Sequence, residues 1–372
     1  MLPNYNENMK IVIVYHGGCL DGIACSWVLQ KYFTTTKNKN KDDIIMIGMS
    51  PQCLNLFEEL DKHYINIESG FTLENNMKTG YNIIFVDICP TANILNDMIK
   101  LNNNNLSRFE VYDHHITNKD IFNINYNNFI ANINWVFDMK RCGCQIVWDE
   151  FMITPVLGII KARPKFIDYI GDGDLWKWEL QDSKLTYGVL QNNFKSIDKL
   201  EKLYNLGDDY FTNTGESGFI TQYLNKEKYI QEYCQKKINK LILKAEKRII
   251  KVCYNEHKNI NYNIWLVECF DISLCSELGS QLCKKVFNNE NNDDENENNI
   301  YPDFVMIIKK INYDINYNFE HKLQFEISLR SNKYIKSEIN VANISNIYGG
   351  GGHAQAAGFT ISYEELCKII IP

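Results

Sequence analysis

The most constraining feature of this 372-residue sequence is that three short apolar runs each end in residues that can bind a metal. The runs are Ile11–Tyr15, Ile83–Val86 and Phe109–Tyr112, the last of which is broken by Glu110. Continuous β-branched runs of this length are typical of parallel strands buried on both faces. The residues that follow these runs are His16, Cys19 and Asp21 after the first, Asp87 after the second, and Asp113, His114 and His115 after the third. A short histidine run alone is often a helix cap or a surface loop, but its recurrence at three strand ends predicts a metal site.

The first half of the chain alternates strand-like and helix-like segments. Predicted strands lie at 11–15, 44–48, 81–87, 109–113 and 129–134. Predicted helices lie at 23–33, 90–100, 144–151 and 164–170. This alternation predicts an α/β fold with an open, mostly parallel sheet, and such sheets bind ligands beyond the carboxyl ends of their strands.

A glycine-rich acidic stretch, Ile170-Gly-Asp-Gly-Asp174, precedes Trp176 and Trp178. It has two interpretations that the sequence leaves open. The carboxylates could belong to a ligand loop, or the stretch could be an ordinary turn, because Gly-Asp-Gly is common turn chemistry.

The remainder of the chain predicts a helical connection and a second unit. The segment Asn225–Arg248 is basic, with apolar residues at helical spacing, and we interpret it as an amphipathic linker helix with a solvated face. After it, strands are predicted at 249–254, 264–269, 304–308 and 323–329, and a helix at 272–287. The predicted domains are therefore 1–200, a helical linker over 201–248, and a smaller α/β domain over 249–372.

The tail of the chain carries four glycines, Gly349 to Gly352, directly before His353. Such a run allows close approach of the backbone to a ligand, with amides that can hold an anion. A flexible loop has the same composition.

Composition excludes several classes of protein. The net charge of −7 argues against broad, non-specific binding of nucleic acid, which needs a basic surface. The 12 cysteines show no Cys-x-x-Cys spacing, Cys142-Gly-Cys144 being the closest pair, so reduced thiols in a cytoplasmic protein are expected. No apolar run approaches the length of a membrane span, so no membrane partner is expected.

These motifs, taken in order, resemble the DHH phosphoesterase superfamily in the branch with a DHHA1 C-terminal domain. His16-Gly-Gly-Cys19-Leu-Asp21-Gly22 resembles the first motif, Asp87 the second, Asp113-His114-His115 the third and Asp172 the fourth. Arg330, with Gly350, Gly351, Gly352 and His353, resembles the substrate-binding residues of DHHA1. The resemblance covers most of the chain.

The resemblance implies two divalent metal ions, usually manganese. His16, residue 19 and Asp87 would hold one ion, and Asp21, Asp87, His114 and Asp172 the other, with Asp87 as the bridge. Two such ions activate a water and hold the phosphoryl oxygens during in-line displacement. His115 would face the phosphate, and Asp113 would orient the loop by hydrogen bonding.

Two positions leave alternatives open. The first motif of the family usually has Asp where this chain has Cys19; a thiolate would favour softer metals, but we favour a packing role for this thiol. Asp174 could replace Asp172 as the ligand from the fourth motif.

The predicted function is therefore metal-dependent hydrolysis of a small phosphorylated substrate, such as a nucleotide, or of a short nucleic acid. Polyphosphate hydrolysis is an alternative within enzymes. A catalytically silent nucleotide-binding protein is an alternative from another class. A structural zinc protein is disfavoured because the candidate ligands are spread along a sheet edge. The sequence leaves the oligomeric state and the physiological substrate open.

Overall fold

The structure, a computed structural model, describes most of the chain. The described residues are 9–50, 53, 55–65, 67, 80–102, 107–119, 133–154, 159–160, 162–208, 219–255, 258–286, 301–311, 324–332 and 339–371. The chain forms two compact units, residues 1–229 and residues 230–372.

The first unit contains a five-stranded, fully parallel sheet, which confirms the predicted α/β class. Its strands are β1 (Lys10–His16), β2 (Ile44–Met49), β3 (Tyr81–Val86), β4 (Arg108–Asp113) and β5 (Ile133–Phe137). They lie in the order β2-β1-β3-β4-β5. The chain therefore leaves β1 in one direction to form β2 and returns on the other side of β1 to form β3. This reversal creates a switch point at the carboxyl ends of β1 and β3, where such folds bind ligands.

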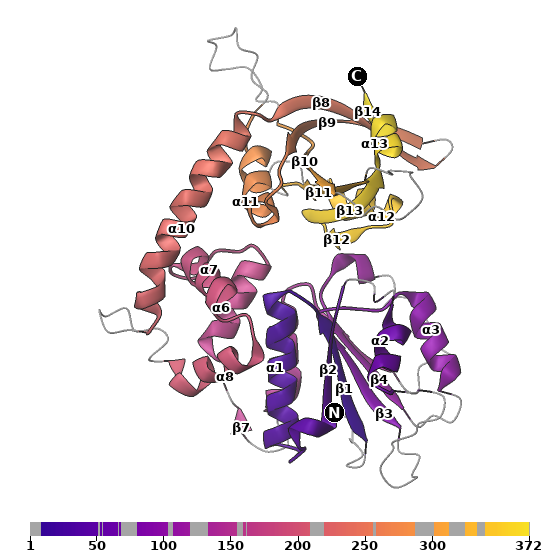
Figure 1. Ribbon diagram of the computed structural model, residues 1–372, viewed down its shortest axis with the longest axis vertical. Helices are drawn as coiled ribbons and strands as arrows, with labels where there is room; N and C mark the ends of the chain where they lie inside the picture. The colour runs from indigo at the N-terminus through magenta and orange to yellow at the C-terminus, as the bar shows by residue number, and fades with distance from the viewer. Residues whose placement is uncertain are drawn as a thin grey trace, which may run out of the picture. The chain divides into compact units, whose positions relative to one another are not determined.

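Helices cover both faces of this sheet (Figure 1). On one face α1 (Leu20–Thr35) and α5 (Gly143–Met152) pack in a core that includes the stacked rings of Trp27 and Trp148, whose centroids are 6.1 Å apart. On the other face α2 (Leu56–Lys62) and α3 (Ala92–Leu101) pack in a second core. Because successive side chains of a strand face opposite sides, β1 contributes Ile11 and Ile13 to one core and Val12 and Val14 to the other.

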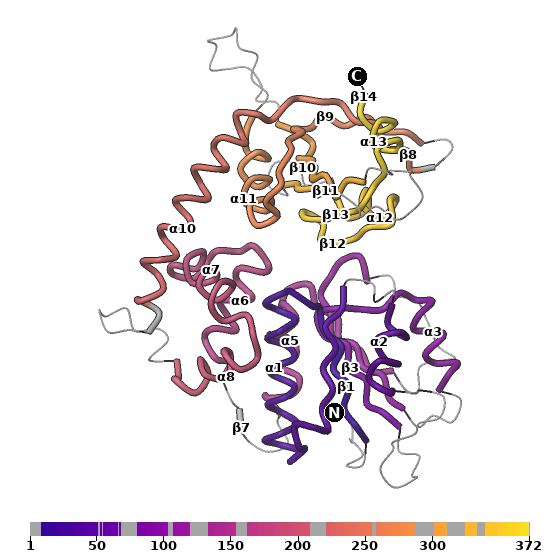
Figure 2. The backbone as a smooth tube through the Cα atoms, viewed as in Figure 1, coloured from indigo at the N-terminus to yellow at the C-terminus, as the bar shows by residue number. Residues whose placement is uncertain are grey.

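Three further helices extend the α1–α5 layer. They are α6 (Lys165–Asp174), α7 (Ser183–Asn193) and α8 (Ile197–Leu206). The backbone trace in Figure 2 shows α5 beside α1, and side chains of α6, α7 and α8 share their core. Short elements complete the description of this unit: η1 (Lys41–Asp43), η3 (Ile116–Asn118), β6 (Ile153–Thr154) and β7 (Ile159–Ile160). The acidic stretch, for which the sequence left a ligand loop and an ordinary turn open, is helical, because residues 171–174 form the last turn of α6.

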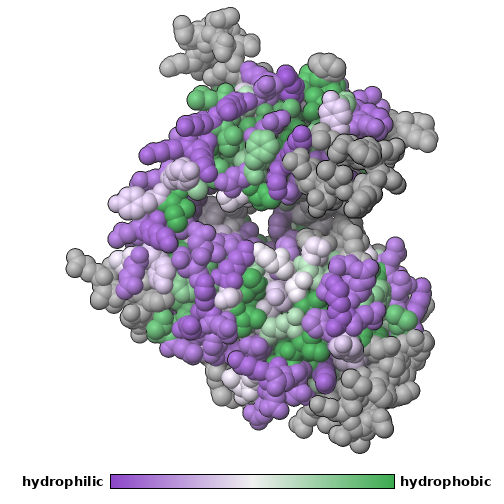
Figure 3. Space-filling view, in the orientation of Figure 1, coloured by the Kyte–Doolittle hydropathy of each residue, from purple (hydrophilic) through white to green (hydrophobic). Residues whose placement is uncertain are grey.

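The long helix α10 (Phe219–Ile242) contains the boundary between the two units. It ends earlier than the predicted helix, because the chain from Glu246 onward forms a strand. The predicted solvated face is present: Lys226, Lys228, Lys236 and Lys240 are exposed. The surface view shows this helix as mainly hydrophilic (Figure 3).

The second unit contains a seven-stranded mixed sheet. Its strands are β8 (Glu246–Asn255), β9 (Lys258–Glu268), β10 (Phe304–Ile311), β11 (Gln324–Arg330), β12 (Gly351–His353), β13 (Ala356–Ser362) and β14 (Ile370–Ile371). They lie in the order β12-β13-β11-β10-β9-β8-β14. The helices α11 (Ile272–Cys283), α12 (Val341–Ile347) and α13 (Tyr363–Ile369) accompany the sheet.

The predicted elements of the second unit are confirmed with shifted ends. The predicted helix at 272–287 ends at Cys283, and the four predicted strands correspond to β8, β9, β10 and β11. In the first unit the predicted fifth strand is displaced to Ile133–Phe137, and residues 129–132 lie outside the described residues. Among the helices of the described part of the chain, none is both long enough and apolar enough to span a bilayer.

Candidate metal centre

The residues that follow β1, β3 and β4 meet at the carboxyl edge of the first sheet. His16 ends β1, and Asp21 lies in the first turn of α1. Asp87 directly follows β3 with a φ of 56°, in the left-handed region that non-glycine residues rarely occupy. Such strained backbone clusters at functional sites. His114 follows β4 and completes the set that the parallel register brings to one edge.

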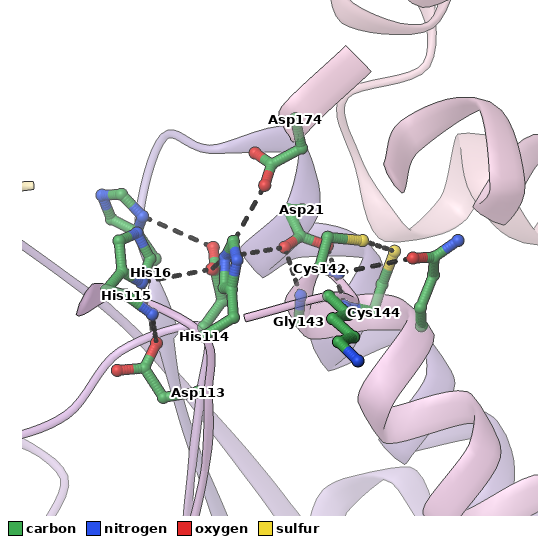
Figure 4. Close-up of polar contacts among 12 residues, drawn as sticks. His16, Asp21, Asp113, His114, His115, Cys142, Gly143, Cys144 and Asp174 are labelled. Atoms are coloured by element: carbon green, nitrogen blue, oxygen red, sulfur yellow. Dashed lines mark hydrogen bonds and ion pairs between the residues drawn. The ribbon is translucent and has the colours of Figure 1, made fainter. Parts of the chain in front are cut away.

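His114 is the centre of the cluster. Its Nε2 atom lies 3.1 Å from Asp87 Oδ1, 3.6 Å from Asp174 Oδ2 and 3.7 Å from Asp21 Oδ2. Figure 4 shows the side chains of Asp21 and Asp174 directed toward this imidazole. Asp174 ends α6, so four separate elements supply this group.

A second group shares Asp87. One ligand atom each from His16, Cys19 and Asp87 lies within 4.8 Å of the other two, and so do the ligand atoms of Asp21, His114 and Asp174. His16 Nδ1 is 3.4 Å from Asp87 Oδ2. Asp87 therefore contacts histidines of both groups through its two oxygens. The two groups are therefore candidate cation sites that share one carboxylate.

Burial perturbs the protonation of these groups. For Asp21, burial and the negative charges of Asp87 and Asp174 raise the pKa to about 7. For Asp87, burial works in the opposite direction, but the imidazoles of His114 and His16 outweigh it and hold the pKa below its usual value. Burial alone would lower the pKa of His114, yet the hydrogen bond to Asp87 and the charge of Asp174 raise it to about 10. The raised pKa of His114 favours its protonated form, whose positive charge partly compensates the carboxylates as a bound cation would.

The side chains fit divalent cations. Asp87 Oδ2 and Asp174 Oδ2 are buried, and neither accepts a hydrogen bond from a described residue. Buried carboxylate oxygens normally have donors or coordinate metals. Carboxylate and imidazole together suit manganese, and also iron or cobalt.

Cys19 lies against this cluster, although the sequence favours only a packing role for its thiol. It is the residue before α1, and its surroundings are acidic. Burial and the charges of Asp87, Asp174 and Asp21 raise the pKa of the thiol well above its usual value. Cys19 is therefore a neutral thiol until a cation compensates these carboxylates.

Asp113 orients His115. Its Oδ1 atom lies 2.7 Å from His115 Nδ1, and its Oδ2 atom accepts a hydrogen bond of 2.6 Å from Asn118. Burial lowers the pKa of His115, but the charge of Asp113 outweighs this effect and raises it. This contact fixes the imidazole and favours its cationic form, which can donate to an anion.

The amino-terminal end of α5 holds Asp21, a contact that sequence reasoning missed. The backbone amide of Gly143 donates to Asp21 Oδ2 at 2.6 Å, and that of Cys144 donates to Oδ1 at 2.8 Å. A Cβ on Gly143 would lie 2.9 Å from Asp87 Cβ, so only glycine permits this approach. One signal of this contact was available in the sequence, a glycine directly before the predicted helix at 144–151. In the sequence alone, however, Gly143 is only the residue between Cys142 and Cys144.

Asp172, the predicted ligand from the fourth motif, and Asp174, its alternative, have different surroundings. Two residues in a helix are about 200° apart around its axis, so Asp172 and Asp174 face different directions. Asp172 faces the segment that follows α6. Its carboxylate accepts hydrogen bonds from the amides of Glu179 and Leu180 and from the Ser183 hydroxyl, so its oxygens already have donors.

The second unit places Arg330 against α11. Its Nη1 atom donates to Ser328 Oγ at 2.7 Å and to the Leu329 carbonyl at 2.8 Å, and its Nη2 atom donates to Ser276 Oγ at 3.1 Å. Among the described residues no carboxylate forms an ion pair with Arg330. Burial lowers the pKa of this guanidinium. A largely buried cation without a carboxylate suits an anionic ligand.

His353 lies on the same face of the sheet as Arg330. In the register of the strands Arg330 pairs with Ala356, and Ala356 pairs with His353. Side chains of directly paired residues share a face, and two strand spacings separate these two by roughly 10 Å.

The second half of the glycine run belongs to a hairpin strand and not to a flexible loop. Gly351 and Gly352 pair with Gly358 and Ala357 in β13. A Cβ on Gly350 would lie 2.5 Å from Ser345 Oγ, and one on Gly352 would lie 2.5 Å from the Ala356 carbonyl. Close backbone packing therefore accounts for glycine at both positions.

Comparison with known proteins gives distant similarities. No family model matches the sequence. An uncharacterized protein of Acanthamoeba polyphaga mimivirus is 23% identical over 365 residues, which cover 98% of this chain and 70% of the viral protein.

Three solved structures have a distantly similar backbone arrangement. The pGpG-specific phosphodiesterase PggH from Vibrio cholerae has a TM-score of 0.40 at 10% identity, with 96% of this chain and 95% of that chain covered. RecJ from Thermus thermophilus in complex with Mn²⁺ has a TM-score of 0.44 at 12% identity, and this chain spans 50% of its length. An exonuclease RecJ bound to manganese has a TM-score of 0.43 at 12% identity, with coverage of 96% and 87%. Function must therefore be argued from the side chains of this chain.

Proposed function

We propose that this protein is a phosphoesterase that depends on two divalent cations, with manganese preferred, and that it hydrolyses a nucleotide or a short oligonucleotide. The observation that carries the proposal is the convergence of Asp21, Asp87, His114 and Asp174 from four separate elements. Three adjacent carboxylates, two of them buried and that of Asp174 half-buried, repel one another unless cations or protons compensate them. The DHH-like order of the motifs along the sequence supports the same assignment.

Each cation has a candidate ligand set. One set is His16, Cys19 and Asp87. The other is Asp21, Asp87, His114 and Asp174. When bound, two such cations lower the pKa of a water and neutralise the charge that develops on a phosphoryl group. Asp87, which contacts both sets, is the residue on which the arrangement most depends.

The chain's own residues would hold the reacting phosphate. His115, fixed by Asp113 through Nδ1, offers its Nε2 atom as a donor to a phosphate oxygen. Its raised pKa favours the imidazolium, which strengthens that hydrogen bond. Asp113 is a positioning residue, because it acts through His115.

Arg330 and His353 are the candidate substrate-binding residues of the second unit. The supporting observations are the guanidinium without a carboxylate partner among the described residues and the shared sheet face. Of the predicted glycines Gly350, Gly351 and Gly352, the first and last would contribute mainly by letting the backbone at β12 pack closely.

Arg330→Ala should raise KM by about 10- to 150-fold, which corresponds to losing a charged hydrogen bond of about 1.5–3 kcal/mol. The metal content should stay unchanged, since Arg330 is not among the candidate ligands. Arg248→Ala is the matched control, because Arg248 is an exposed arginine of the same unit. Lost metal with intact substrate affinity would contradict this assignment.

The function is tested by a hydrolysis screen with added metal. The substrates are short RNA, nucleotide phosphates, cyclic dinucleotides and polyphosphate. We expect turnover that chelation abolishes and that Asp87→Ala removes, while Asp97→Ala, at an exposed carboxylate, retains it. Full activity after chelation, or near wild-type activity in folded Asp87→Ala, would refute a metal-dependent enzyme.

Cys19 favours a second candidate, a nucleotide-binding protein without turnover. A neutral thiol is a poor ligand, and burial keeps this one neutral in the absence of metal. This candidate requires that the protein bind nucleotides yet hydrolyse none of the substrates in the screen.

A further inference from the structure

The segment after Asp174 holds two tryptophans in an unusual conformation. We call residues 175–182 the tryptophan loop. Trp176 has a φ of 56° and Trp178 a φ of 58°, both in the left-handed region. Bulky residues are rare there because the Cβ approaches the carbonyl oxygen. In addition, Trp178 Nε1 is buried and has no hydrogen-bond partner among the described residues.

The two indole rings form a corner that solvent reaches. Their centroids lie 4.8 Å apart and their planes meet at 71°. Trp176 is 42% exposed. The loop therefore presents an aromatic face at the surface, at a cost in backbone strain and in hydrogen bonding.

Asp172 holds this loop in place. Its carbonyl accepts hydrogen bonds from the amides of Lys177 at 2.9 Å and Trp178 at 3.5 Å, while its carboxylate accepts those of Glu179 and Leu180. One residue thus satisfies four consecutive amides. Of the two carboxylates in the acidic stretch, Asp172 organises the loop, while Asp174 faces the metal cluster.

The aromatic corner adjoins that cluster. One residue, Leu175, separates Trp176 from Asp174, so their Cα atoms lie at most about 7 Å apart. The ring of Trp178 packs edge-on against Tyr187, with centroids 5.8 Å apart. A Cβ on Gly173 would collide with the Tyr187 ring. The tryptophans, Tyr187 and the end of α6 are therefore in continuous contact.

We propose that Trp176 and Trp178 form a stacking subsite for a nucleobase of the substrate, an assignment that rests on the proposed phosphoesterase function. Carboxylates and cations recognise any phosphoester, including polyphosphate, and so do not distinguish among them. An aromatic ring beside them adds binding energy for a substrate with a planar base, but not for polyphosphate, which has none. The corner thus selects nucleotides over polyphosphate. Every base has a π-face, so the subsite recognises bases without preference for one sequence.

Kinetics on paired substrates tests the subsite. The pair is a 5′-phosphorylated diribonucleotide and the same molecule without its bases. Stacking is worth about 1–3 kcal/mol, so Trp176→Ala should lower the ratio of kcat/KM for the base-containing over the abasic substrate by about 5- to 150-fold. The loss should appear mainly in KM. Trp176→Tyr, which retains a stacking face, should restore the ratio to within about threefold.

Leu180→Ala is the matched control, because Leu180 is an exposed apolar residue of the same loop. It should retain the wild-type ratio. The proposal would be overturned if Trp176→Ala left the ratio unchanged, including the case in which kcat/KM falls by the same factor for both substrates. Failure of the tyrosine variant to restore the ratio would do the same.

A binding experiment separates this proposal from the function it depends on. Adenosine 5′-monophosphate is titrated into metal-free protein, and quenching of tryptophan fluorescence is recorded. We expect quenching in wild type and Leu180→Ala, and a weaker response with weaker affinity in Trp176→Ala. If the wild type hydrolyses nothing, the enzyme proposal fails while this titration still decides the subsite. Equal affinity in wild type and Trp176→Ala would refute stacking.

Discussion

Replacement of Gly143 by alanine should damage the metal centre through the backbone alone. The added Cβ would lie 2.9 Å from Asp87 Cβ, 2.9 Å from Cys25 Sγ and 3.0 Å from Asp21 Oδ2. Real Cβ atoms do not approach buried atoms this closely, so the first turn of α5 must move away. Movement lengthens the hydrogen bonds of 2.6 Å and 2.8 Å that hold Asp21.

The magnitude follows from three contributions. Loss of one hydrogen bond to a charged group costs about 1.5–3 kcal/mol. Overpacking costs about 1–3 kcal/mol. The greater helix propensity of alanine over glycine returns up to about 1 kcal/mol. The free energy of unfolding of metal-loaded Gly143→Ala should therefore fall by roughly 2–5 kcal/mol. Metal affinity should fall about 10- to 100-fold, as is typical when a group that orients a ligand is lost.

Urea unfolding and calorimetric titration with manganese measure the two effects. Cys144→Ala is the comparison, because it removes a buried thiol of the same turn but keeps the amide that donates to Asp21. It should lose stability yet bind metal as the wild type does. A folded Gly143→Ala protein with wild-type metal affinity would refute the reasoning that α5 positions Asp21.

Three further predictions concern the ligands. Asp174→Ala should lose bound manganese, measured by elemental analysis, whereas Asp172→Ala should keep it and lose stability; the reverse result would favour Asp172 as the ligand. Metal binding needs a neutral His114 and an ionised Asp21, and their pKa values are about 10 and about 7, so manganese affinity should rise with pH from about 6 to about 9. Calorimetry in buffers of different ionisation enthalpy should show proton release, and its absence would contradict both pKa shifts. Cys19→Asp should raise manganese affinity by supplying a hard oxygen ligand, and a lower affinity would identify the thiol as the preferred ligand.

The sequence by itself determined the architecture of the first unit and the edge on which its site lies. Continuous β-branched apolar runs of this length are buried best as interior parallel strands, and parallel strands place their carboxyl ends together. For this reason His16, Asp87 and His114 could be placed at one edge from their positions after 11–15, 83–86 and 109–112 alone. The position of each of these residues directly after an apolar run was enough to predict the edge on which it lies.

Only the tertiary structure shows that Asp174 lies beside His114, at 3.6 Å, while Asp172 accepts hydrogen bonds from the segment after α6. Their directions follow from the helical phase of α6 and from its packing, since Gly171 adjoins Gln145 and Gly173 adjoins Tyr187. No pattern within the stretch reveals which face of the helix meets the cluster.

Contacts between distant segments were equally beyond the sequence. Gly143 lies 122 residues from Asp21, and their hydrogen bond depends on how α5 packs against α1. Likewise the pairing of β12 with β13, which brings His353 into register with Arg330, depends on strand partners and not on the glycines themselves. Residue type specifies which chemistry is available, but only packing fixes which groups meet, because a side chain's direction depends on partners far along the chain.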